Sequence, residues 1–109
     1  MKTYFFLVAF FLYQLTVIAQ QDAWIYFTDK PNATALISNP ISILSQASID
    51  RKTNHSIAID ERDVPVHEAY IAQIKASTGI TYKAKSKWFN ALHVRGTEMD
   101  INSLLTYNF

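Results

Sequence analysis

The side chains that could do chemistry in this sequence are three histidines, nine acidic residues and a scatter of hydroxyl groups, and the chain has no cysteine. His55, His67 and His93 have no second ligand at metal-binding spacing, and no H-E-x-x-H motif is present. His67 and Glu68 are neighbours, so on a helix their side chains would point about 100° apart and would not work as a pair. We therefore expect neither a metal site nor a cofactor.

Motifs for nucleophilic catalysis and for phosphate binding are missing as well. With Gly79 and Gly96 as the two glycines, the chain can form neither a G-x-S-x-G elbow nor a glycine-rich phosphate loop. None of its serines stands in a context that would supply a base and an oxyanion hole. The sequence thus predicts that these residues carry no catalytic group and that the chain is not itself an enzyme.

Length and charge exclude further classes of function. The 109 residues allow one small domain, and ten Lys and Arg against nine Asp and Glu leave no strongly basic face for nucleic acid. Lysines alternate with aromatic residues between positions 82 and 89, a pattern also used by binders of single-stranded nucleic acid. A plain amphipathic ribbon explains the alternation better, and no nucleic-acid partner is expected.

The first nineteen residues have the pattern of a secretory signal peptide. Lys2 is followed by an apolar stretch that reaches Ala19. Val17 and Ala19 are small residues that suit the −3 and −1 positions of signal peptidase, which predicts cleavage between Ala19 and Gln20. We expect a signal peptide at 1–19 and an exported domain at 20–109, secreted or retained in the cell envelope, without stable membrane association after cleavage.

The elements that must position any functional surface begin with a strand. Residues 23–28 form a continuous run of β-branched and aromatic residues that predicts a buried strand, followed by a turn at 29–32. Pro40 suits the first turn of a helix and Asn39 its cap. A helix is therefore expected over about residues 40–52.

A second helix is expected from Pro65, with Asp63 as its cap and Gly79 as a left-handed stop. The apolar side chains on its inner face are expected to be Val66, Tyr70 and Ile74, with Ala69 beside them. Two strands follow at 80–84 and 88–94, with residues 85–87 between them, so they could pair as a hairpin or form one bent ribbon.

The last helix is expected to begin at Thr97, with Asp100 completing a weak variant of the capping box. Its apolar positions are Ile101, Leu104, Leu105 and Phe109. Apart from the helix near residues 40–52, the order strand, helix, strand, strand, helix is that of a split βαβ unit. The sequence therefore predicts an α+β domain with an extra N-terminal helix and without the last strand of that plan.

Four segments in order resemble the start of secreted bacterial subtilisin-like serine proteases (the subtilase family). They are residues 22–31 (DAWIYFTDKP), 44–52 (LSQASIDRK), 63–67 (DVPVH) and 84–96 (AKSKWFNALHVRG). The last segment also resembles the K-x-x-N-A-x-x-[AV] strand of subtilisin propeptides, at Lys87, Asn90, Ala91 and Val94. Trp88 belongs to the resemblance through the stretch 88–91 (WFNA).

The resemblance implies a ferredoxin-like prodomain that acts as a folding chaperone and temporary inhibitor. Its partner would be the cognate subtilisin-like protease domain, in cis, and the outer face of its sheet would lie on two helices of that domain. Because the catalytic motifs of the family lie in the protease domain and do not occur here, the resemblance assigns no catalytic residue to this chain. The full-length parent would be a serine endopeptidase, and this sequence would be truncated before its catalytic domain.

The side of the sheet that would meet the protease follows from strand alternation near residues 88–95. Trp88, Leu92 and Val94 share the more apolar side and are expected to face the helices. The expected protease-contact residues are those on the other side, Phe89, Ala91, His93 and Arg95. On that assignment, Ala91→Asp should weaken protease binding with little loss of folding.

Two alternative interpretations remain at this stage. One is a free-standing secreted protease inhibitor of the same fold, acting in trans. The other is a small membrane-anchored envelope protein that keeps residues 4–19 as a span, although Gln14 and Thr16 interrupt that stretch.

Overall fold

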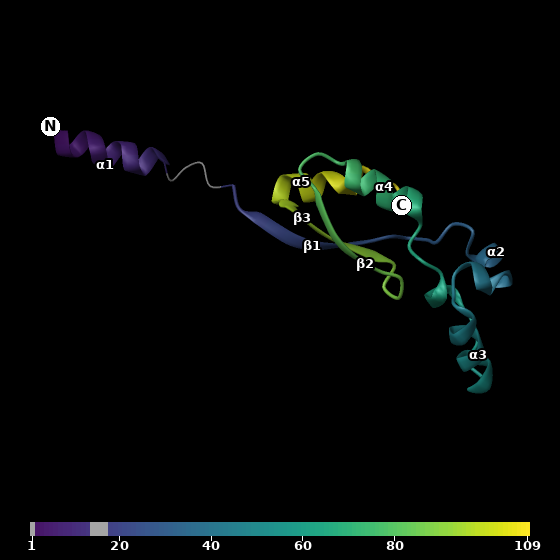
Figure 1. Cartoon of the computed structure of the whole chain (residues 1–109). Coiled ribbons are helices and arrows are strands. Elements are labelled where there is room, and N and C mark those ends of the chain that lie inside the picture. The colour runs from purple at the N-terminus through teal and green to yellow at the C-terminus, as the bar shows by residue number, and fades with distance from the viewer. Residues whose placement is uncertain (1, 14–17) are drawn as a thin grey trace.

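The structure, a computed structural model, describes residues 2–13 and 18–109 (Figure 1). The helices are α1 (Lys2–Tyr13), α2 (Ala33–Ser38), α3 (Gln46–Asn54), α4 (Glu68–Ala76) and α5 (Glu98–Ser103). The strands are β1 (Gln20–Tyr26), β2 (Thr81–Ser86) and β3 (Ala91–Thr97). Short 3₁₀ turns form η2 (Pro40–Ser42), η3 (Glu61–Asp63) and η4 (Leu104–Thr106).

The three strands form one antiparallel sheet in the order β1-β3-β2. Because β3 is antiparallel to both neighbours, β1 and β2 run in the same direction, and α4 lies in the connection between them. Helices α4 and α5 cover the same face of the sheet (Figure 1). The predicted α+β fold is confirmed, and the strand order is that of a split βαβ unit.

The core lies between this sheet and its helices. Its buried cluster consists of Phe27, Val66, Ile71, Ile74, Leu92, Val94 and Leu104. Aromatic side chains close one end of it, where Phe109 stacks on Tyr70 with ring centroids 4.2 Å apart. The Tyr70 hydroxyl donates to Asp29 Oδ1 at 2.7 Å, and this bond raises the pKa of Tyr70. Apolar burial of this kind supplies most of the stability of a small domain.

The helix expected from Pro65 begins later than predicted, at Glu68. Asp63 does not cap it but belongs to η3, where its carboxylate accepts the backbone N–H of Asp60 at 3.1 Å. Within α4 the inner positions are Ile71 and Ile74, and Ala69 is exposed. Gly79 adopts the predicted left-handed conformation, with φ +73°, which glycine tolerates. The helix itself ends earlier, at Ala76, and Ser77 is its C-cap.

The prediction of a single helix over residues 40–52 is wrong. Pro40–Ser42 form only a 3₁₀ turn, and the Asn39 side chain makes no capping bond. α3 starts at Gln46 because the Ser45 hydroxyl accepts the backbone N–H of Ser48 at 3.2 Å. The sequence analysis also missed the helix at Ala33–Ser38.

The strands are displaced from their predicted bounds. β1 begins at Gln20 and is not a buried strand, because within the described residues it pairs only with β3 and has one face uncovered. The expected hairpin is present, but β3 begins at Ala91 instead of residue 88. Residues 87–90 form the turn, and Asn90 takes φ +50° there, a value that Asn tolerates better than most residues.

The last helix starts as predicted, with the Thr97 hydroxyl accepting the backbone N–H of Asp100 at 3.2 Å. It ends at Ser103, and η4 follows, so Phe109 folds back onto Tyr70 instead of continuing the helix. At the other end of the chain, α1 lies apart from the sheet (Figure 1). No helix within residues 2–13 and 18–109 has the length and apolar character needed to span a membrane.

Candidate interaction surface

The sheet has one covered face and one open face. Strand alternation turns Leu92 and Val94 toward the helices, and their partners on β1 are Ile25 and Ala23. The opposite face carries Asp22, Trp24 and Tyr26 from β1 and His93 and Arg95 from β3. Trp24 is 48% and Tyr26 63% exposed, which is unusual for such large side chains. We call this set of five residues the open face.

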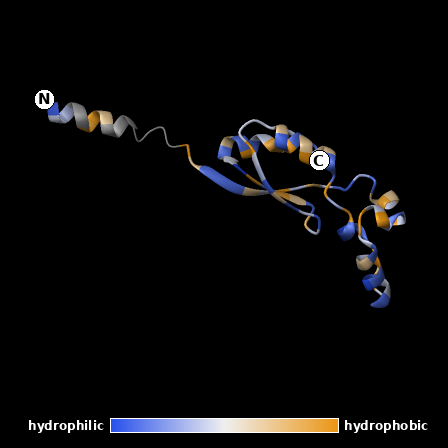
Figure 2. Ribbon diagram, viewed as in Figure 1, coloured by the Kyte–Doolittle hydropathy of each residue, from blue (hydrophilic) through white to orange (hydrophobic). Residues whose placement is uncertain are grey.

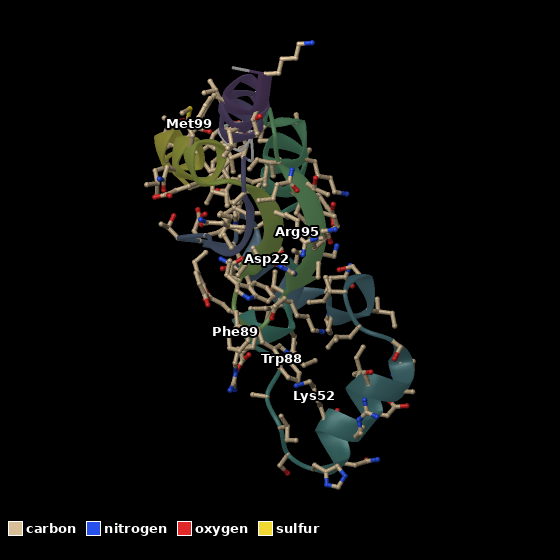
Figure 3. All side chains as sticks on the ribbon, turned by 90° about the vertical axis from the view of Figure 1, so that its left-hand side faces the viewer. Asp22, Lys52, Trp88, Phe89, Arg95 and Met99 are labelled. Atoms are coloured by element: carbon tan, nitrogen blue, oxygen red, sulfur yellow. The ribbon has the colours of Figure 1, made fainter. Side chains whose placement is uncertain are left out.

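A charged cluster lies on the open face. The Arg95 guanidinium donates to Asp22, from Nε to Oδ1 at 3.1 Å and from Nη2 to Oδ2 at 3.0 Å. His93 Nε2 lies 3.0 Å from Asp22 Oδ1. The hydrogen bonds from Arg95 and His93 lower the pKa of Asp22, and its carboxylate raises the pKa of Arg95. Figure 3 shows Asp22 and Arg95 close together on the sheet.

Aromatic stacking orients the rest of the open face. The rings of Trp24 and His93, which are paired residues on β1 and β3, lie 5.4 Å apart at 28°. Stacking holds the indole across the strands while leaving about half of it accessible. The result is a surface of exposed aromatic rings beside an oriented Asp–Arg pair, residue types that are frequent at protein–protein interfaces.

The predicted contact residues fall in different environments. His93 is half-buried and Arg95 exposed, and both belong to the open face, whereas Phe89 is exposed in the turn before β3. Ala91 is 0% exposed where it pairs with Tyr26. The expectation that Ala91→Asp would leave folding intact is therefore wrong, because the new carboxylate would be shut off from water.

The predicted helix-facing side is correct for Leu92 and Val94, which are both fully buried. It is wrong for Trp88, which is 73% exposed. The reason is that Trp88 lies in the turn, where the two-residue alternation of a strand does not apply.

One motif residue of the turn, Asn90, has a clear structural role. The Asn90 side-chain amide donates to the backbone oxygens of Phe27 at 3.3 Å and Asp29 at 2.8 Å. The Phe27 backbone N–H donates in return to Asn90 O at 2.9 Å. Asn90 thus ties the β2–β3 turn to the end of β1, which gives a physical reason for asparagine at this position.

Lys30 is a structural residue that sequence reasoning missed. Its ammonium donates to the backbone oxygens of Glu61 at 2.6 Å, Val64 at 2.7 Å and Lys87 at 2.6 Å. Burial lowers the pKa of Lys30. The one sequence feature that could have pointed to Lys30 is its place within the 22–31 segment, just after the first strand. Its three acceptors are distant in sequence, and only the fold brings them together.

The remaining histidines lie outside the open face. His67 precedes α4 and sits edge-on to the Tyr70 ring at 4.8 Å, and His55 follows α3. Across residues 2–13 and 18–109, no three side chains of the metal-binding types come together.

The predicted signal-cleavage position lies immediately before the sheet. Ala19 and Gln20 are both exposed, and β1 begins at Gln20. Val17, the other residue expected at this site, lies outside the described residues.

Comparison with known proteins gives one family match. The model of the peptidase S8 propeptide domain of Bacteroidota matches residues 22–109, which include the whole open face. No curated protein and no solved structure matches the chain.

Proposed function

Because the chain belongs to the peptidase S8 propeptide domain family of Bacteroidota, we propose that it is the prodomain of an exported subtilisin-like serine protease. In this role it assists the folding of the protease domain in cis and inhibits that domain until the prodomain is removed. The chain itself supplies a binding surface and no catalytic group. The family match over residues 22–109 is the observation that carries this proposal.

The open face is the surface that we propose contacts the protease. It combines two exposed aromatic side chains with an arginine already oriented by Asp22. Exposed Trp, Tyr and Arg are the residue types that most often dominate binding energy at protein interfaces. His93 stacks on Trp24 and fixes its position, so the surface loses little conformational entropy when it binds.

Export through a signal peptide is part of the same proposal. The accessible backbone at Ala19 and Gln20 suits a cleavage site, and cleavage there would leave every residue of β1 in place. The protein recovered after export is therefore expected to begin at Gln20, as N-terminal sequencing would test.

The test is an inhibition and refolding assay with the peptidase S8 domain of the same precursor, identified by sequencing the gene beyond codon 109. The full chain is added to the active domain and peptide hydrolysis is measured, and it is added separately to the denatured domain during refolding. We expect inhibition in the first assay and faster recovery of activity in the second.

The Trp24→Ala variant tests the surface. Loss of a hot-spot tryptophan is expected to weaken inhibition by about tenfold or more. Met99→Ala is the matched control, because Met99 is also large, apolar and exposed but lies on α5, in the helix layer. A wild-type chain that has no effect in either assay would overturn the prodomain function. Equal inhibition by wild type and Trp24→Ala would overturn only the choice of the open face.

A further inference from the structure

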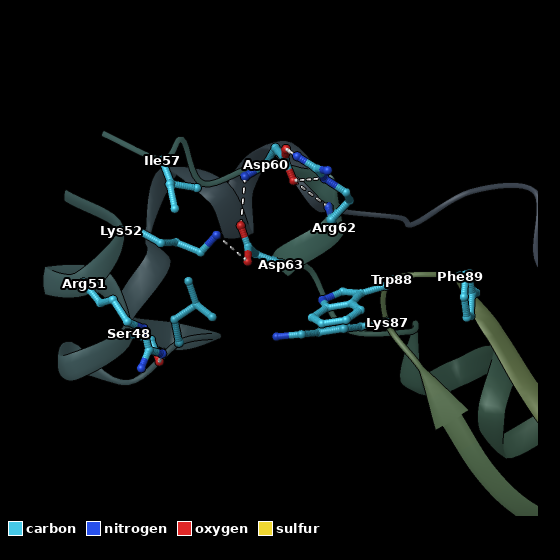
Figure 4. A pocket seen from close by; sticks show the side chains of 11 residues that line it. Ser48, Arg51, Lys52, Ile57, Asp60, Arg62, Asp63, Lys87, Trp88 and Phe89 are labelled. Atoms are coloured by element: carbon cyan, nitrogen blue, oxygen red, sulfur yellow. Dashed lines mark hydrogen bonds and ion pairs between the residues drawn. The ribbon is translucent and has the colours of Figure 1, made fainter. Parts of the chain in front are cut away.

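A groove of about 630 Å³ lies between α3 and η3 on one side and the β2–β3 turn on the other (Figure 4). Its apolar lining consists of Leu44, Ile57, Trp88 and Phe89. Its charged lining consists of Arg51, Lys52, Asp60, Arg62, Asp63 and Lys87. The groove is distinct from the open face, since it is built from segment 31–63 and the turn.

Pairing within the groove leaves an excess of positive charge. The Lys52 ammonium lies 3.1 Å from Asp63 Oδ1, and this pair is partly buried. Around the 3₁₀ turn, Arg62 Nη2 donates to Asp60 Oδ2 at 2.8 Å. Both acidic residues of the lining are therefore already engaged, while four cations line the groove.

Two cations of the lining have no acidic partner within the described part of the chain. The Arg51 guanidinium donates only a 3.3 Å bond to the Ser48 hydroxyl, and the Lys87 ammonium takes part in no ion pair. Trp88 and Lys87 both extend from the turn toward α3 (Figure 4). The groove thus presents an exposed indole together with two unpaired positive charges.

The two walls of the groove are joined by Lys30. Its ammonium binds Glu61 O and Val64 O on the η3 side and Lys87 O in the turn, all within 2.7 Å. Because one partly buried cation connects both walls, the groove is formed before any ligand arrives. A preformed site of this kind binds with a smaller entropy loss than a flexible one.

We propose that this groove binds an acidic segment on the surface of the protease domain, one that also carries an apolar side chain for Trp88. This inference rests on the function proposed above and adds a second, electrostatic contact to it. Charge complementarity decides the occupant, because unpaired Arg51 and Lys87 favour carboxylates and disfavour basic segments. The groove also adjoins the proposed interface, since the turn that carries Trp88 leads directly into β3 and its open-face residues.

The experiment measures the affinity of full-length variants for the protease domain whose catalytic serine is replaced by alanine, so that the prodomain is not cut. Arg51→Glu and Lys87→Glu reverse the two unpaired charges. Lys75→Glu is the matched control, because Lys75 is exposed on α4, outside the groove, with its ammonium 4.4 Å from the centre of the Tyr82 ring. Each groove variant is expected to raise Kd by about tenfold or more, and the control to change it by less than about twofold.

The salt dependence of the affinity is an independent test of the electrostatic contact. Raising NaCl from about 0.05 M to about 0.5 M shortens the screening length severalfold, so wild-type affinity should fall more steeply than that of Lys87→Glu. Circular dichroism and urea midpoints verify folding. If Lys87→Glu fails to fold, Arg51→Glu replaces it in the salt comparison, because Arg51 is exposed on α3 and the substitution reverses the other unpaired charge.

The outcomes separate this inference from the proposed function. If the wild-type chain binds the protease and the groove variants bind like Lys75→Glu, the groove contact is overturned and the prodomain function stands. If the wild-type chain does not bind, both fail. If Lys87→Glu instead dissolves a dimer seen by size-exclusion chromatography while protease affinity is unchanged, the groove binds a second copy and the inference is overturned.

Discussion

Two regions of the molecule are stabilised by different means. One is the sheet with α4 and α5, which we call the sheet half, and the other is segment 31–63. The sheet half encloses seven buried apolar side chains in one cluster. Within segment 31–63, Ala33 and Asp63 are the buried residues, and Figure 2 shows α3 as largely hydrophilic. That segment depends on polar contacts instead. The Lys52–Asp63 pair joins α3 to η3 within it, and the Lys30 ammonium bonds to Glu61 O.

The difference separates overall stability from surface shape. Apolar burial is non-directional and grows with area, so the sheet half contributes the bulk of the folding free energy. Hydrogen bonds and ion pairs add about 1 kcal/mol each, but they fix geometry. Segment 31–63 therefore contributes less to stability and forms one wall of the groove, where Lys30 holds it against the β2–β3 turn.

The largest expected effect comes from a cavity in the sheet half. Leu92 is fully buried near the start of β3, where it pairs with Ile25 of β1, so Leu92→Ala should lower the free energy of unfolding by about 2–5 kcal/mol. Urea denaturation followed by circular dichroism measures it. Leu105→Ala, at an exposed position in η4, is the control and should change stability by less than about 0.5 kcal/mol. Equal losses for the two variants would contradict a core centred on Leu92.

An intermediate effect is expected from removing the connection between the two halves. Lys30→Met keeps the length of the side chain but leaves three backbone oxygens without their donor, at a cost of about 1–3 kcal/mol. The loss should be local, so amide hydrogen exchange should accelerate in α3 and η3 more than in β3. Lys87→Met is the control, because among the described residues that ammonium makes no ion pair. If hydrogen exchange instead accelerated equally in the sheet half and in segment 31–63, the two regions would not be stabilised separately.

The smallest effect is a pH dependence that each half should show separately. Hydrogen bonds from Arg95 lower the pKa of Asp22 in the sheet half, and those from Arg62 lower the pKa of Asp60 in segment 31–63, both from an ordinary value of 3.8. A carboxyl whose folded-state pKa is lowered stabilises the fold above the unfolded-state value. That contribution disappears as the pH falls through the folded-state pKa.

Asp22→Asn and Asp60→Asn test this dependence. Each variant should be slightly less stable than wild type at neutral pH, and the difference should shrink as the pH falls below 3.8. Urea unfolding across that range should report Asp22→Asn, and hydrogen exchange in segment 31–63 should report Asp60→Asn. A difference that grows on acidification would reverse the assigned direction.

Patterns confined to neighbouring residues were predictable from the sequence. The left-handed Gly79, the Thr97 cap, the hairpin and the inward side of Leu92 and Val94 all follow from local backbone and alternation rules. Errors arose where two local signals competed. Pro40 and Asn39 suggested a helix start, but Ser45 holds the capping bond, and the aromatic run at 88–89 resembled a strand although it forms a turn.

Composition, periodicity and the ordered segments of this sequence determined the α+β fold, the strand order along the chain and the propeptide family, because these depend on contacts between near neighbours and on residue types. The tertiary structure alone decided how Lys30 joins three distant backbone oxygens, how Asp22 meets His93 and Arg95, and where Trp88 faces. The physical reason is that such contacts depend on how β1 registers against β3 and how segment 31–63 packs on the turn, and no local pattern encodes either.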